Sequence, residues 1–66
     1  MNATEVNRTY AAASIASSIS SLCALLSEAL CNDPDTSIAG EAVEGVGELA
    51  QRLFQDLHKL ASGEEG

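Results

Sequence analysis

A single turn signal divides this chain into two long stretches that suit helices. Gly and Pro are absent from Asn2 to Leu30, and the only proline, Pro34, lies in the short polar segment Cys31-Asn32-Asp33-Pro34-Asp35. Because Gly and Pro are the strongest breakers of regular structure, nothing else punctuates the first half of the chain. Two helices joined by so short a connection must lie side by side and antiparallel.

Capping signals stand at the ends of both stretches. Asn2 followed three residues later by Glu5 is typical of a capping box at a helix start, and Ser62-Gly63 suits a helix end. In the turn, Asn32 suits the left-handed backbone conformation that often follows the end of a helix. Asp33-Pro34 suits an N-cap followed by the first residue of the second helix. We therefore expect one all-α domain over residues 1–66, with helices at about 3–31 and 36–62, a turn at about 32–35 and a frayed tail at 63–66.

The chain is too small and too poor in bulky side chains to be stable as a lone hairpin. It has 66 residues, and 45% of them are apolar, but eleven of these are Ala, with one Phe, one Tyr and no Trp. Small domains usually need disulfides, a metal or oligomerisation. We therefore expect the antiparallel two-helix hairpin to dimerise into a four-helix bundle.

The two cysteines do not supply a crosslink within the chain. Cys23 and Cys31 are eight residues apart on one helix, about 12 Å along its axis, and a disulfide needs Cα atoms within about 7 Å. Two unpaired thiols indicate a reducing compartment, so we expect the protein in the cytoplasm.

Large apolar residues recur at helical spacing in both stretches. They form a stripe on each expected helix, and the second stretch carries its charged residues on the opposite side. We expect the bundle core to consist of Ile15, Ile19, Leu22, Leu26, Leu30, Val46, Leu49, Leu53, Phe54, Leu57 and Leu60.

The back of the first helix is unusual because it has small, uncharged residues where a solvated face normally carries Lys and Glu. One interpretation is that Ser is merely tolerated at the surface. The other is that this face is buried in an assembly, with the first helix inside and the second outside. The candidate interaction residues on this face are Tyr10, Ala13, Ser17, Ser20, Ser21 and Ala24.

Acidic residues dominate the charge, with ten Asp and Glu against three Lys and Arg and a formal net charge of −7. Glu41, Glu44 and Glu48 cluster on one side of the second helix. This cluster is either a solvated face or a recognition surface for a basic partner, including one that normally binds nucleic acid. Direct nucleic-acid binding is disfavoured, because three cations neutralise few phosphates.

Three glycines interrupt the second stretch, and each costs about 0.5–1 kcal/mol relative to Ala in a helix interior. In a hairpin where paired residue numbers sum to about 66, Gly47 lies opposite Ile19 and Gly40 opposite Leu26. The glycines, Gly45 included, then either permit close helix packing or form a soft segment that orders when a partner binds.

No motif predicts catalysis, a metal site or a cofactor. His58, the only histidine, is expected near Arg8 and far from both cysteines, and no Gly-rich loop follows a strand. A membrane or secretory segment is disfavoured too. Residues 9–27 carry no charge, but six serines interrupt them and no Lys or Arg cluster flanks them.

Short sequence patterns resemble a group of small helical proteins of unknown function from pseudomonads and related bacteria. The resemblance covers roughly residues 10 to 57 and implies a helical hairpin without any assigned activity or functional residue. Its patterns are Tyr10-Ala11-Ala12-Ala13-Ser14, Leu22-Cys23, Leu25-Leu26-Ser27-Glu28-Ala29, the acidic turn and Gly47-Glu48-Leu49-Ala50.

The expected function is therefore not enzymatic. We expect a homodimeric protein-interaction or regulatory module that binds an unidentified protein through its helix faces. The alternatives are an acidic inhibitor that mimics nucleic acid and blocks a basic surface on its target, and a structural subunit of a larger helical assembly.

Overall fold

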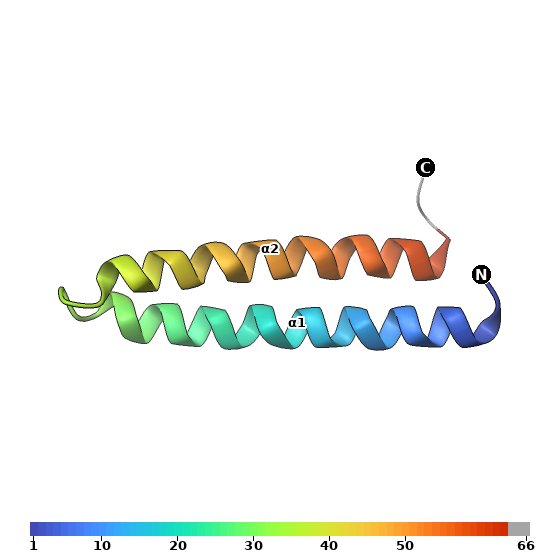
Figure 1. Ribbon diagram of the computed structural model, residues 1–66, viewed down its shortest axis with the longest axis horizontal. Coiled ribbons are helices and arrows are strands. Elements are labelled where there is room, and N and C mark those ends of the chain that lie inside the picture. Colours follow the sequence, from blue (N-terminus) through green and yellow to red (C-terminus); the bar gives the residue numbers. More distant parts are fainter. Residues whose placement is uncertain (64–66) are drawn as a thin grey trace.

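The computed structural model, which describes residues 1–63, is an antiparallel pair of α-helices (Figure 1). Helix α1 spans Ala3–Cys31 and helix α2 spans Ser37–Ser62. The turn closes one end of the pair, and the start of α1 lies beside the end of α2 at the other (Figure 1). The expected all-α hairpin is confirmed. Of the expected frayed tail, residues 64–66 lie outside the described part of the chain.

Both outer helix ends are capped by the expected residues. The side-chain oxygen of Asn2 accepts a hydrogen bond from the Glu5 backbone N–H at 2.9 Å, and the Asn2 amide donates to the Glu5 carboxylate at 3.2 Å. These bonds satisfy one of the free N–H groups at the start of α1. At the end of α2, Gly63 is left-handed with φ 76°, and its N–H donates to the Leu60 carbonyl at 3.3 Å.

The turn differs from the expected one in two respects. Asn32 is right-handed, with φ −74°, so the prediction of a left-handed residue there is wrong. Asp33 does not cap α2, because its carboxylate accepts the Asp35 backbone N–H at 2.9 Å and closes a local turn. The N-cap is Thr36, whose hydroxyl donates back to the Leu30 carbonyl at 2.6 Å. Helix α2 consequently begins one residue later than expected.

Small residues form the seam between the helices. The residues that are buried there are Ala13, Ala16 and Ser27 from α1 and Gly40, Gly47 and Ala50 from α2. Because small side chains let helix backbones approach closely, a Cβ atom added to Gly47 would lie 2.9 Å from the Cβ of Cys23. One added to Gly40 would lie 3.1 Å from the Cβ of Leu30.

Close packing at these two glycines is therefore confirmed, but the residues opposite them are not the expected ones. Gly47 meets Cys23 instead of Ile19, and Gly40 meets Leu30 and Cys31 instead of Leu26. Paired residue numbers sum to about 70 rather than 66. Part of this shift follows from the later start of α2, and part from the turning of small residues, not the large ones, toward the partner helix.

Within one chain, most of the expected core is exposed to solvent. Ile15 and Leu49 are each 62% exposed, Leu22 is 65% exposed and Leu53 is 52% exposed. Leu30, Phe54 and Leu57 are half-buried. The expected core does not form inside the hairpin, because the seam is built on a different side of each helix.

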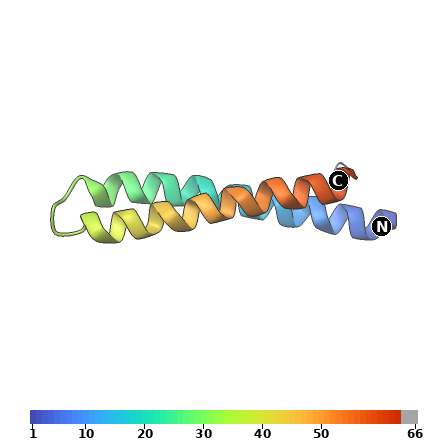
Figure 2. The same cartoon turned by 90° about the horizontal axis from the view of Figure 1, so that it is seen from above.

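The hairpin is a single layer of helices. Its Cα atoms extend over 49 × 21 × 10 Å, and the shortest dimension is about the diameter of one helix. Seen from above, the two helices cross at a shallow angle (Figure 2). Folded domains normally bury their apolar surfaces between at least two layers, and this chain provides only one.

Candidate interaction faces

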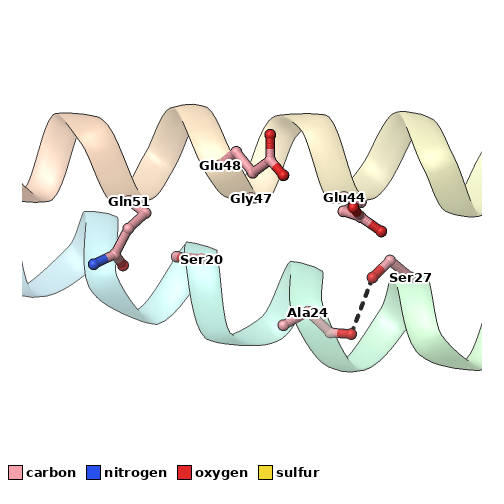
Figure 3. Close-up of a pocket in the computed structure, with 7 residues that line it drawn as sticks. All are labelled: Ser20, Ala24, Ser27, Glu44, Gly47, Glu48 and Gln51. Atoms are coloured by element: carbon pink, nitrogen blue, oxygen red, sulfur yellow. Dashed lines mark hydrogen bonds between the residues drawn. The ribbon is translucent and has the colours of Figure 1, made fainter.

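One broad face of the hairpin carries a groove along the seam. The groove has a volume of about 410 Å³ and lies open to solvent. Its walls come from both helices, with small residues on α1 and long polar residues on α2 (Figure 3). The lining residues are Ser20, Ala24, Ser27, Glu44, Gly47, Glu48 and Gln51.

The opposite broad face is apolar. Successive helix residues are rotated by about 100°, which places the large exposed residues of α1 about 100° from the buried line of Ala13, Ala16 and Ser27. The groove residues of α1 lie on the other side of that line, and the same division holds on α2. Because the groove residues share one face, the two apolar stripes share the other. We name this surface the apolar face: Ile15, Ile19, Leu22, Leu26, Val46, Leu49, Leu53 and Leu60.

Some candidate residues on the back of α1 lie in the seam between the two helices, and the others lie on the surface. Ala13 is only 2% exposed because it packs against α2, so its assignment to an interaction surface is wrong. Ser17 and Ser20 are half-buried beside the seam, while Ser21 and Ala24 are exposed. Part of this face is thus buried by α2 of the same chain. The expectation that α1 lies inside the assembly is not needed to explain its small residues.

The acidic cluster borders the groove. Glu44 and Glu48 stand on its α2 side, opposite Ser20 and Ala24, and Glu41 is also exposed. Two groups of candidate residues, identified separately in the sequence, therefore meet in one place. The groove also includes Ser27, whose hydroxyl donates to the Ala24 carbonyl at 3.0 Å.

Sequence reasoning missed Ser27, Gly47 and Gln51 as parts of the groove. A signal for two of them exists. Ser27 follows Ser20 by seven residues, and Gln51 follows Glu44 by seven, so each continues the line of a candidate residue along its helix. Their meeting across the seam depends on the register of the hairpin, which the spacing alone does not provide.

Tyr10 lies near the open end of the hairpin, where it packs against α2. Its ring meets the His58 ring edge-on, with centroids 5.5 Å apart, and Phe54 lies 5.9 Å from the same imidazole. Aromatic rings favour such tilted arrangements. His58 therefore packs on Tyr10, which lies two residues along α1 from the expected neighbour Arg8. Tyr10 is still 39% exposed and available at the surface.

Metal-binding groups do not gather in residues 1–63, where no three His, Cys, Asp or Glu side chains stand close enough to hold an ion. The thiols of Cys23 and Cys31 are both free, the first half-buried and the second exposed.

Helix α1 is long and apolar enough, by length and composition, to cross a membrane. Both soluble core helices and signal sequences share these properties, so the finding is compatible with a helix that another protein layer covers. Our expectation of a cytoplasmic protein stays a prediction.

Comparisons with protein-family models, with curated proteins and with solved structures find no match to this chain. The resemblance to small helical proteins of pseudomonads stays a prediction for that reason.

Proposed function

We propose that this protein is a non-catalytic interaction module that works as a homodimer in the cytoplasm, with the apolar faces of two hairpins packed together as a four-helix bundle. The apolar face carries this proposal. Its eight large side chains run along both helices of a one-layer structure, and each is at least 39% exposed in the single chain. Exposed apolar patches that are large and continuous are typical of protein–protein contacts.

The single chain exposes enough surface to include one face of a protein–protein interface. The chain exposes 4685 Å², whereas a compact monomer of 6.8 kDa would expose about 3,950 Å². The excess of about 700 Å² approaches the roughly 800 Å² that each partner buries in a standard interface. A second copy with the same face would supply the missing layer.

Covering the apolar face leaves the groove side free for another protein. That side offers the small uncharged residues Ser21 and Ala24, the aromatic ring of Tyr10, and the carboxylates of Glu44 and Glu48. A helix or an extended segment with small or basic residues would fit such a surface. We therefore assign partner binding to the groove side and self-association to the apolar face.

A second function, inhibition of a nucleic-acid-binding protein, is favoured by the acidic row itself. Glu41, Glu44 and Glu48 are exposed, and no Lys or Arg occurs between Thr9 and Gln51. The row thus presents a run of negative charge whose nearest cation along α2 is Arg52, one helical turn after Glu48. A target that binds phosphates would recognise it by charge.

Salt dependence separates the two functions. We expect proteins captured from host lysate at about 0.1 M salt to stay bound at about 0.5 M, because packing on Tyr10, Ser21 and Ala24 does not depend on charge. At 0.5 M the screening length falls to about 4 Å, which weakens contacts between exposed charges.

The matched control is the triple variant Glu41→Gln, Glu44→Gln and Glu48→Gln, which keeps the shape of the surface. Capture that persists in high salt and in this variant supports the interaction module. Loss of the captured protein in both cases would instead assign the acidic inhibitor function.

A further inference from the structure

The groove along the seam has the periodicity of a helix on both of its walls. It is open to solvent, and most of its exposed surface is apolar. The lining residues follow one another at intervals of four and three residues, which is about one helical turn, over about 10 Å. They are Ser20, Ala24 and Ser27 on α1, and Glu44, Glu48 and Gln51 on α2 (Figure 3).

We propose that the groove binds an amphipathic α-helix of a partner protein. This helix inserts apolar side chains among the small residues of the groove and places Lys or Arg beside the carboxylates of α2. The inference rests on the proposed function, which assigns partner binding to the groove side, and it names the element of the partner that is recognised.

The walls of the groove favour a helix over an extended segment. An extended segment binds by adding to a sheet edge, and residues 1–63 form only helices, whose backbone groups bond within the helix itself. A polyproline segment docks in grooves lined by aromatic rings, and none of the seven lining residues is aromatic. A helix satisfies its own backbone hydrogen bonds, so it can dock where neither wall offers backbone donors or acceptors.

The charge of the groove is one-sided. Its α1 wall is uncharged, whereas Glu44 and Glu48 border it on α2. Glu48 precedes Arg52 by four residues, but neither Lys nor Arg lies three or four residues from Glu44. The complementary helix therefore carries its cations on the flank that faces α2. Because these carboxylates are exposed, they mainly steer association and fix how the helix lies, while packing supplies the affinity.

A second copy of this chain does not have that complementary surface. Helix α1 has one cation, Arg8, and α2 has two, Arg52 and Lys59. Arg52 follows Glu41 by eleven residues and Lys59 follows it by 18, so all three lie on one side of α2. Another copy would thus bring its own carboxylates to the groove together with its cations. The charge pattern points to a helix of a different protein.

The experiment selects binders to the full chain from a library of random peptides of about 15 residues, enough for about four helical turns. We expect the selected peptides to repeat apolar residues at helical spacing, to carry Lys or Arg on one flank, and to gain helical ellipticity on binding. A selection that yields no binder would overturn the proposal.

Two variants fill the groove from its two walls, so the test does not depend on the folding of either one alone. Ala24→Leu adds a bulky side chain on α1 and Gln51→Phe adds one on α2, both at exposed positions that line the groove. Because overpacking is costly, each should weaken peptide binding about tenfold or more. The control is Ser18→Leu, since Ser18 is exposed and lies about 200° around α1 from the buried Ala16. Peptides that bind all three variants as well as the original protein would overturn the groove as their site.

The triple variant Glu41→Gln, Glu44→Gln and Glu48→Gln separates charge from packing. At about 0.1 M salt we expect the association rate of a selected peptide to fall about threefold to tenfold, with little change in its dissociation rate. An unchanged association rate would contradict the pairing of its cations with α2.

The mass of the complex, measured by light scattering, distinguishes this inference from the proposed function. A homodimer that carries helical peptides supports both. A homodimer that selects only extended peptides, which Ala24→Leu displaces, overturns the helix and keeps partner binding by the groove side. Peptides that bind a monomer regardless of Ala24→Leu would occupy the apolar face and overturn both.

Discussion

Leu53→Asp is expected to convert a folded dimer into a largely unfolded monomer. In a single hairpin the Leu53 side chain is 52% exposed, so a carboxylate there would stay in water and cost little. In the dimer the same carboxylate would be buried in the apolar face without a partner, once in each copy. Burying an unpaired charge is strongly destabilising, and losing the leucine alone costs about 2–5 kcal/mol per site. Circular dichroism and light scattering at micromolar concentration measure the loss of helix and of mass.

The control is Gln55→Asp, which introduces the same charge two residues away on the exposed polar side of α2. We expect this variant to keep the helix content and mass of the original protein. A Leu53→Asp protein that stays folded and dimeric would refute the role of the apolar face.

Gly47→Ala and Gly45→Ala are expected to change stability in opposite directions. A Cβ at position 47 would lie 2.9 Å from the Cβ of Cys23, closer than real Cβ contacts, so the helices must move apart. Overpacking of this kind costs about 1–3 kcal/mol, which exceeds the gain in helix propensity. At position 45 nothing lies within 4 Å of the added atom, and the propensity gain of about 0.5–1 kcal/mol is kept.

Urea unfolding of the two variants at equal protein concentration measures this difference. The free energy of unfolding should fall for Gly47→Ala and rise for Gly45→Ala. Equal changes in the two variants would contradict a seam that depends on the close approach of α1 and α2 at Gly47.

The two helices and their antiparallel pairing could be predicted because local chemistry determines them. The Asn2 cap, the left-handed Gly63 and the absence of breakers before Leu30 are properties of short segments. The details of the turn could not be predicted in this way, because they depend on a contact between the two ends of the turn. The Thr36 hydroxyl that bonds the last turn of α1 has no signature in residue spacing.

The faces through which the two helices contact each other differ from the prediction more than the turn does. Apolar periodicity identifies the residues that avoid water, and it correctly finds the stripes of the apolar face. It does not say which surface covers them. Within the chain, α1 and α2 meet through Ala13, Ala16 and Gly47, because small residues allow the closest backbone approach.

Residue spacing was also insufficient to predict the groove. Ser20 and Ala24 were identified on one helix, and Glu44 and Glu48 on the other, from their chemistry and spacing. Only the register of the hairpin brings the two pairs to opposite walls of one groove (Figure 3).

The solution mass tests the central claim most directly, because a second copy is the layer that we propose covers the apolar face. Light scattering at micromolar concentration should give twice 6.8 kDa, and the melting temperature should fall on dilution, as expected when folding and association are linked. A 6.8 kDa particle whose helices melt cooperatively at a temperature independent of concentration would contradict the account.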